Sequence, residues 1–539
     1  MPHLLRGVRV LQSAGLIEMG RPRQLLYASR ATRSLGAIAG ACAASARRDP
    51  DRAAIIDDEG ATTYAELDAR TTALARAWLA NGLSIETTVG VLCRDHRQAV
   101  EAMVAVGKLG GRLVLLNTGF SGPQLADVAR REGVDVLVAD ADLAPQLDGL
   151  ERHIPTYVAY GEVDGMPSTC DLIERESLCD AVESVPWPKT NRGFVLLTGG
   201  TTGTPKGAPR TVRSPLVAAQ FLERIPMRRG DVVLVAAPIF HGTGMSQFTI
   251  AFALGCTVVL RRRFDAAGTM RAMRAHQVTM LVAVPTMLQR IVAFEEGQLR
   301  RALPSLRVIL SAGAPLTAGL GERVVERFGP VLHNLYGCTE VALATIATAE
   351  DWTAAPGTVG RPPTGVVVRI VDDQDQVITR PDVSGRIFVG NPLAFDGYSG
   401  GGTKPQLEGL LGTGDLGHWD ADGRLFVDGR DDDMIVSGGE NVFAGEIDDL
   451  VSAMPGVVEV ATIGVPDEEF GQRLRVYLVR EDDHPTEDEV KEAVRVRLAR
   501  FKVPREVMVV DDIPYTATGK VARGMLIKQA VRSHRSTEE

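Results

Sequence analysis

The stretch TGGTTGTPKG, residues 198–207, carries the most information about the fold and the chemistry of this chain. It places four glycines, four threonines and one lysine directly after the apolar run 194–197. Glycines let a backbone approach a ligand closely, and a nest of N–H groups, hydroxyls and one cation suits a triphosphate. The stretch is not the common P-loop, because Pro205 precedes Lys206 and Gly207 follows it. The P-loop needs glycine before the lysine and serine or threonine after it.

Length and composition restrict the class of protein. A chain of 539 residues exceeds what one hydrophobic core usually serves, so we expect two or more domains. The net charge of -9, without a long basic run, argues against nucleic acid as the main partner. Six scattered cysteines without a CxxC pair favour a reduced, cytoplasmic protein without a zinc site. The longest apolar window, 248–260, is shorter than the ~18 residues of a membrane-spanning helix.

Arginine outnumbers lysine by 51 to 8, which favours a GC-rich bacterial genome and makes every lysine more informative, Lys206 and Lys520 above all. The first 35 residues carry six of the arginines against a single acid, Glu18. This composition resembles a transit peptide, but we favour a surface helix followed by a basic arm. The apolar residues of this segment also leave open a weak peripheral contact with the inner membrane.

The chain reads as α/β. Short apolar runs that alternate with helical stretches predict layered α/β packing with mostly parallel sheets in a large N-terminal domain, residues 36–430. Its last part, about 357–430, has short strands broken by turns and predicts a small β-barrel-like subdomain. A smaller α+β domain follows over 431–539, within the usual size of a domain. Two capping boxes, Thr63 with Glu66 and Thr486 with Glu489, predict helix starts.

Five short motifs occur in a fixed order: TGGTTGTPKG (198–207), PIFHGTG (238–244), YGCTE (336–340), TGDLG (413–417) with GRDDDMIVSGGEN (429–441), and TATGKVAR (516–523). Any one of them alone is a weak signal. Together they resemble the adenylate-forming superfamily of acyl-CoA synthetases, adenylation domains and luciferases, over about residues 50–530. SGGEN and GVPDEEFGQ (464–472) look most like the fatty-acyl-CoA synthetase branch.

The resemblance implies a nucleotide site for ATP. The residues that it assigns to the phosphates are Thr198, Thr201, Thr202, Gly203, Thr204 and Lys206. Those that it assigns to adenine and the α-phosphate are Ala312, Gly313, Ala314, Pro315, Tyr336, Gly337 and Thr339. Asp415 and Arg430 would bind the ribose hydroxyls, since a carboxylate accepts well from a diol. Taken singly, each of these short segments would be an ordinary turn.

The resemblance also assigns catalytic and metal-binding roles, to Lys520, Glu340, Thr339 and His241. Lys520 would bridge the substrate carboxylate and the α-phosphate. Glu340 would hold Mg²⁺, which needs one or two carboxylates besides phosphate and water. His241 lies either at the entrance of the acyl pocket or as a structural residue at a strand end. Cys338 is expected to be a packed small residue rather than a nucleophile.

A rotation of the C-terminal domain between two half-reactions is implied, with Asp432 at the hinge position. One conformation would present Lys520. The other would present the segment Ser437, Gly438 and Gly439 and open a tunnel for the pantetheine arm of coenzyme A, where glycines allow close passage.

The predicted function is an ATP- and Mg²⁺-dependent fatty-acid–CoA ligase for a medium- or long-chain acid. Its apolar acyl pocket is expected to use Phe240, His241, Gly244, Met245 and Phe248. Three alternatives stay open: a fatty acyl-AMP ligase that loads a carrier protein, an aryl-acid CoA ligase, and an inert acyl- or AMP-binding homologue. The sequence also leaves a homodimer open.

Overall fold

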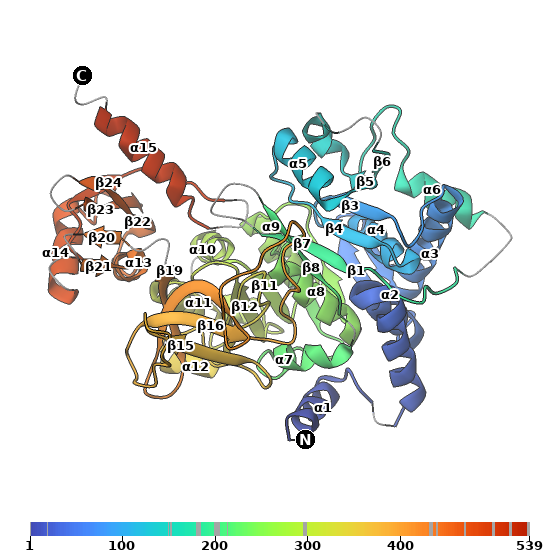
Figure 1. Ribbon diagram of the computed structural model, residues 1–539, viewed down its shortest axis with the longest axis horizontal. Coiled ribbons are helices and arrows are strands. Elements are labelled where there is room, and N and C mark those ends of the chain that lie inside the picture. The colour runs from blue at the N-terminus through green and yellow to red at the C-terminus, as the bar shows by residue number, and fades with distance from the viewer. Residues whose placement is uncertain are drawn as a thin grey trace.

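The structure is a computed structural model that describes residues 2–18, 20–148, 150, 154–178, 185–198, 205–212, 214–294, 299–430, 435–437, 440–467, 471–498, 502–516 and 520–535. Figure 1 shows a large body that holds the N-terminal and central elements, with the C-terminal elements gathered at one end. Across the described ranges, no helix combines the length and the apolar character that crossing a membrane requires.

The first large sheet has eight strands, six of them parallel. Antiparallel strands close both of its edges. In spatial order the strands are β14 (Thr345–Ala347), β13 (Leu332–Tyr336), β12 (Val308–Ala312), β11 (Met280–Ala283), β9 (Val232–Val235), β10 (Thr257–Val259), β1 (Ala53–Asp57) and β2 (Gly60–Thr63).

The second sheet has six strands and is parallel except for its last hairpin. Its order is β6 (Thr156–Val158), β5 (Val136–Ala139), β3 (Thr88–Leu92), β4 (Arg112–Leu115), β7 (Phe194–Thr198) and β8 (Lys206–Arg210). Every residue of β3 is buried, which is typical of a strand covered on both faces. The predicted layered α/β domain is confirmed.

Helices form the layers around the two sheets. The main hydrophobic core lies between them, where both sheets pack against α2 (Pro22–Arg48), α3 (Tyr64–Ala80), α4 (Arg97–Leu109) and α8 (Gly242–Leu254). The outer face of the first sheet carries α9 (Ala266–Ala275), α10 (Pro285–Phe294) and α11 (Ala318–Phe328), and that of the second carries α5 (Gly122–Glu132). The remaining helices of this part are α6 (Thr169–Ser177), α7 (Ala218–Leu222) and α12 (Ala349–Ala354).

The first 35 residues hold two helical segments, where we expected one surface helix followed by a basic arm. They make up α1 (Pro2–Ala14) and the first half of α2. Leu11 is fully buried, because the apolar side chains of α1 recur on one face and cover α7. A left-handed Gly36, at φ 83°, bends α2.

The smaller units follow the predicted order. A third, antiparallel sheet comprises β15 (Val367–Val371), β16 (Gly385–Gly390), β17 (Gln406–Leu407), β18 (Leu410–Trp419) and β19 (Leu425–Arg430). The C-terminal sheet comprises β20 (Ile435–Ser437), β21 (Glu440–Val442), β22 (Val457–Asp467), β23 (Gly471–Arg480) and β24 (Glu506–Val509). It packs with α13 (Ala444–Ser452), α14 (Glu487–Arg497) and α15 (Arg523–Arg535).

Two side chains of the large domain reach backbone carbonyls of the C-terminal domain. Gln289 on α10 donates to the carbonyl of Val458, and Arg323 on α11 donates to the carbonyl of Ser452 at 3.2 Å. Gly319, also on α11, lies against the backbone of Ala453. The C-terminal domain is therefore docked on the first sheet's outer helices, on the side of α10 and α11 (Figure 1).

The contact between α11 and α12 should tolerate no added methyl group. A Cβ on Gly321 would collide with the ring of Trp352, which is 1% exposed. Overpacking of this kind costs about 1–3 kcal/mol, so we expect Gly321→Ala to lower the thermal unfolding midpoint. Gly7→Ala is the control, because its Cβ would lie 3.6 Å from Ala219 Cβ within a helix that favours alanine. Equal midpoints for the two variants would contradict the packing.

Candidate active site

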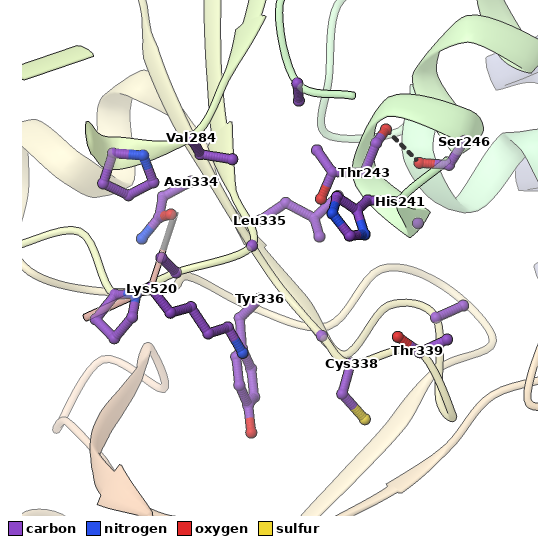
Figure 2. Close-up of a pocket in the computed structure, with 18 of the residues that line it drawn as sticks. His241, Thr243, Ser246, Val284, Asn334, Leu335, Tyr336, Cys338, Thr339 and Lys520 are labelled. Atoms are coloured by element: carbon purple, nitrogen blue, oxygen red, sulfur yellow. Dashed lines mark hydrogen bonds between the residues drawn. The ribbon is translucent and has the colours of Figure 1, made fainter. Parts of the chain in front are cut away.

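One cavity of about 1680 Å³ collects residues from all five sequence motifs. Its lining includes Thr198, Lys206, His241, Tyr336, Glu340, Asp415, Arg430 and Lys520. These positions come from the large domain, the third sheet and the C-terminal domain. Figure 2 shows His241, Tyr336, Cys338, Thr339 and Lys520 around the pocket. Segments more than 300 residues apart in sequence therefore meet at one place.

The fold explains why these segments converge. Strands β7, β12 and β13 end at Thr198, Ala312 and Tyr336. Thr198 itself and the loops that follow β12 and β13 line the cavity. In open α/β sheets, ligands bind beyond the carboxyl ends of the parallel strands. Lys206 opens the returning strand β8 of the second sheet, so the two sheets face each other across the cavity.

Tyr336, Asp415 and Arg430 form one group. The Tyr336 hydroxyl donates to Oδ2 of Asp415 at 2.6 Å. Arg430 Nη1 lies 4.0 Å from Oδ1 of the same carboxylate, because β18 and β19 pair Asp415 opposite Arg430. Burial raises the pKa of Asp415, against the opposing effects of Tyr336, Arg430 and Lys520. A carboxyl group with two oxygens in a cavity suits a diol.

Glu340 is the buried carboxylate of the site and is 6% exposed. Burial opposes its ionisation, but the hydrogen bond from Tyr398 and the charge of Lys404 together hold its pKa below the usual range. The Tyr398 hydroxyl donates to Oε1 of Glu340 at 2.6 Å. Lys206 Nζ lies 5.0 Å from the centre of the same tyrosine ring. Tyr398 therefore connects the motif lysine with the motif glutamate.

His241 is neutral in this environment. Burial first, and then the charge of Lys520, lowers its pKa to about 4. Its Nε2 is shielded from solvent and has no hydrogen-bond partner among the described residues. His241 stands at the N-cap position of α8, where its imidazole makes no capping hydrogen bond, and it lines the cavity. At neutral pH it can offer a hydrogen bond to a ligand but no positive charge.

Cys338 behaves as a packed residue, as the sequence predicted. Burial and the neighbouring Glu340 carboxylate raise the pKa of its thiol to about 12. A thiol with such a pKa carries almost no thiolate at neutral pH and is a poor nucleophile.

Of the five residues that we expected to form an acyl pocket, two line the cavity and three do not. His241 and Met245 line the cavity. Phe248 is fully buried and packs against Phe252 with ring centroids 4.3 Å apart, because it lies on the opposite face of α8. Phe240 is 9% exposed and contacts the His241 ring at a centroid distance of 4.4 Å, outside the lining. Gly244 faces the backbone of Ala237 and Pro238.

The remaining predicted residues divide into four groups. Those that line the cavity are Gly313, Ala314, Pro315, Gly337 and Thr339. Ala312 is a core residue of β12, 1% exposed, just before that loop. Seven positions lie outside the described residues: Thr201, Thr202, Gly203, Thr204, Asp432, Gly438 and Gly439. Ser437 ends β20, and its backbone alone is described.

The sequence analysis missed three polar residues that belong to the site: Tyr398, Lys404 and Arg210. Lys404 and Tyr398 lie in the glycine-rich segment 398–412. The scarcity of lysine could have indicated Lys404, since Lys206, Lys404, Lys520 and Lys528 all line the cavity. Arg210 donates to the carbonyl of Thr339, and burial lowers its pKa to about 10. No local sequence pattern indicates that Arg210 belongs to the site.

Within the described part of the chain, one other group of side chains resembles a metal site: Cys93, His96 and Asp140. Its donors are already engaged. His96 Nε2 lies 2.7 Å from Asp140 Oδ1, and His96 Nδ1 lies 2.9 Å from Gln98 Oε1. Arg262 also approaches Asp140, at 3.5 Å, and its charge disfavours a cation. We interpret this group as a buried hydrogen-bond network.

Comparison with known sequences agrees with this geometry. The sequence model described as AMP-binding enzyme matches residues 42–399, and the one described as AMP-binding enzyme C-terminal domain matches residues 446–520. The first match alone covers more than half of the chain.

Three similar proteins illustrate the relationship. Indoleacetate–CoA ligase of Aromatoleum aromaticum is 31% identical over 88% of this chain and 94% of its own length. Feruloyl-CoA synthase of an Amycolatopsis species is 31% identical over 89% of this chain and 96% of its own length. The structure of o-succinylbenzoate CoA synthetase from Bacillus subtilis, in complex with its acyl-adenylate intermediate, superposes with a TM-score of 0.77 at 27% identity. That superposition covers 90% of this chain and 97% of the other.

The neutral state of His241 should appear in the pH dependence of stability. The folded-state pKa of about 4 lies below the ordinary value of 6.5, so the unfolded chain binds more protons between these two values. Stability therefore falls as the pH drops from about 6.5 towards 4, by at most about 3 kcal/mol from this residue. We expect His241→Gln to lose this contribution, so that the wild-type unfolding midpoint falls more steeply than the variant's between pH 7.5 and pH 4.5. Parallel profiles would show that the imidazole is not buried as described.

Proposed function

Because the chain belongs to the AMP-binding enzyme family, we propose that it is an AMP-forming acid–CoA ligase for an apolar carboxylic acid. Enzymes of this family that ligate acids to CoA use ATP, Mg²⁺ and coenzyme A, the three cofactors that the sequence predicted. The observation that carries the proposal is the convergence of five separate motifs on one cavity.

The reaction has two halves. In the first, the carboxylate of the acid attacks the α-phosphorus of ATP, and pyrophosphate leaves. In the second, the thiol of coenzyme A attacks the carbonyl carbon of the acyl-adenylate, and AMP leaves. Neither half needs a covalent bond to the protein, so positioning and charge stabilisation are what the side chains contribute. The high pKa of the Cys338 thiol is consistent with such a mechanism.

Four lysines supply positive charge to the cavity: Lys206, Lys404, Lys520 and Lys528. Lys206 begins β8, at the end of the motif that suits phosphates. Lys520 faces the cavity from the C-terminal domain, and its charge acts on both His241 and Asp415. A cation between the acyl side and the ribose side can neutralise charge that develops as the new P–O bond forms. Lys520 would serve the first half-reaction.

Glu340 is suited to hold Mg²⁺. Its carboxylate is kept ionised by Tyr398 and Lys404 and faces the cavity. One carboxylate suffices where phosphate oxygens and water complete the octahedron. The bound ion would neutralise phosphate charge. Tyr398 would hold the carboxylate in place through its hydrogen bond.

Tyr336 and Asp415 would bind the nucleoside. The ring of Tyr336 lines the cavity beside the loop Gly313–Pro315, where small residues leave room for a base. Its hydroxyl orients the Asp415 carboxylate at 2.6 Å, which leaves the other oxygen, Oδ1, for a ribose hydroxyl. Exchange of the C-terminal domain between two positions about Asp432 remains a prediction, since that residue lies outside the described ranges.

The comparisons change our prediction of the acid substrate. The sequence analysis favoured a fatty acid and kept an aryl acid as an alternative. The three similar proteins carry the names of aromatic acids, which favours the alternative. No charged side chain accompanies His241 and Met245 among the cavity residues of α8, so we propose an apolar acid in either case.

A pyrophosphate-release screen tests the proposal. Aromatic acids and fatty acids of graded length are supplied with ATP and Mg²⁺, with and without coenzyme A. We expect pyrophosphate release with at least one apolar acid, and an acyl-CoA product when coenzyme A is present. Acyl-adenylate without acyl-CoA would favour the carrier-protein alternative. No pyrophosphate with any acid would leave only the inert homologue.

Lys520→Ala should separate the two half-reactions. We expect the rate of adenylate formation to fall by ~10²-fold or more, the scale of losing one positioned charge-stabilising group. Attack of coenzyme A on supplied acyl-adenylate should remain close to wild type. Lys491→Ala is the control, because Lys491 pairs with Glu487 on α14, away from the cavity. Equal losses in both half-reactions would contradict the assignment of Lys520 to the first.

Tyr398→Phe should weaken the magnesium site without removing the ring. The variant loses the hydrogen bond that holds the Glu340 carboxylate, and a bond to a charged group contributes about 1.5–3 kcal/mol. We expect the apparent KM for MgATP to rise roughly tenfold or more. Tyr157→Phe, in the distant strand β6, is the matched control. A KM that stays at the wild-type value would exclude this role for Tyr398.

A further inference from the structure

The cavity does not end at His241 but continues along nearly the whole length of α8. The residues of α8 that line it are Gly242, Thr243, Met245, Ser246, Thr249, Ile250 and Ala253. From Met245 onward they follow one another at intervals of one and three, so they occupy a single face of the helix. With a rise of 1.5 Å per residue, the eleven steps from Gly242 to Ala253 cover roughly 16 Å.

The opposite wall of this extension comes from α2. Ala37, Gly40, Ala41 and Ala44 line the cavity at helical spacing, and Arg48 follows one turn later. Packed helices normally interdigitate and leave few voids larger than a water molecule. Here the small side chains of α2 face the lining side of α8, which leaves a passage between two helices that are otherwise in contact. We name this passage, between Ala37–Ala44 and Met245–Ala253, the tail channel.

The two ends of the tail channel differ in polarity. At the near end, the buried Nε2 of His241 has no partner among the described residues and lies on the cavity. At the far end, Arg48 Nη2 donates to the Ala253 carbonyl at 3.1 Å and to Ser45 Oγ at 3.2 Å. Asp49 accepts from Arg48 Nε at 2.9 Å and from Arg229 at 2.6 Å. The walls between these ends are apolar or carry hydroxyls that bond their own helix, as Thr249 does to the Met245 carbonyl.

We propose that the tail channel holds an extended alkyl tail of the acid, and that this enzyme prefers straight-chain acids over compact aromatic acids such as benzoate. The inference rests on the proposed function and specifies its substrate class. An unbranched chain fits a narrow passage that runs beside a helix for roughly 16 Å. Each methylene that enters an apolar channel leaves water, and we expect about a fourfold gain in kcat/KM per methylene until the channel is filled.

Part of the wall of the tail channel lies outside the part of the chain that matches the family. Ala37, Gly40 and Ala41 precede residue 42, where the match to the family begins. Leu16, Ile17 and Leu25, from the end of α1 to the start of α2, also line the cavity. Part of the tail channel is therefore built by a segment of this chain that the family match does not include.

The test compares wild type with variants that narrow the tail channel. Ala44→Phe on α2 and Ala253→Phe on α8 each place a ring in the passage from one side. Arg33→Phe is the control, because it adds the same ring at an exposed position of α2 that does not line the cavity. Pyrophosphate release is measured for straight-chain acids from butanoate to hexadecanoate, and for benzoate and phenylacetate.

We expect wild-type kcat/KM to rise with chain length and to exceed the value for benzoate. In Ala44→Phe and Ala253→Phe, the ratio of kcat/KM for dodecanoate to that for butanoate should fall at least about tenfold, with the wild-type ratio kept in Arg33→Phe. A flat length profile, better turnover of benzoate than of dodecanoate, or unchanged ratios in both narrowed variants would overturn the proposal.

The outcomes for the tail channel and for the proposed function are distinguishable. If benzoate is the only acid that releases pyrophosphate, the ligase proposal stands and the tail-channel proposal fails. If no acid releases pyrophosphate, the ligase proposal fails, and calorimetric binding of dodecanoate to wild type and to Ala44→Phe still decides whether the channel holds an alkyl tail. Equal affinities would show that it does not. Should Ala44→Phe fail to fold, Ala253→Phe and the milder Ala44→Val provide the same comparison.

Discussion

The site depends on keeping one carboxylate ionised inside a buried cavity. Glu340 is 6% exposed, and burial alone would favour its neutral form. The Tyr398 hydroxyl and the charge of Lys404 reverse that preference, and both come from the segment between β16 and β18. The third sheet therefore does more than form one wall of the cavity. It supplies the groups that fix the charge of a residue carried by the first sheet.

Much of this arrangement could be predicted from the sequence, because the motif residues lie at strand ends that the fold brings together. Tyr336 and Asp415, 79 residues apart in sequence, were assigned to one nucleoside, and the structure joins them by a hydrogen bond of 2.6 Å. Both capping boxes are present, with the Thr63 and Thr486 side chains bonded as expected. Local patterns of this kind need no knowledge of tertiary packing.

The other lining residues could not be predicted from the sequence, because they depend on which face of a helix or strand lines the cavity. Phe248 was assigned to the acyl pocket for its apolar side chain, yet its place on α8 turns it into the core against Phe252. Thr249, one residue later, lines the cavity instead. Ala44 on α2 was not predicted to line the cavity. A small residue such as alanine leaves a cavity only where a second helix lies opposite it, and the sequence does not show that pairing. Such pairings between distant segments are decided by the tertiary fold.

The type of hydrogen-bond acceptor at the junction of the two domains affects the free energy that separating them would cost. Gln289 and Arg323 bind across it to the main-chain carbonyls of Val458 and Ser452. A main-chain acceptor released at a surface is readily rehydrated, so the net loss is about 0.5–1.5 kcal/mol for the neutral Gln289 bond and about 1.5–3 kcal/mol for the charged Arg323 bond. Because both acceptors are main-chain carbonyls, these two hydrogen bonds do not depend on the side chains of Val458 and Ser452. Side chains on the C-terminal side of this contact can therefore change in sequence while both hydrogen bonds are kept.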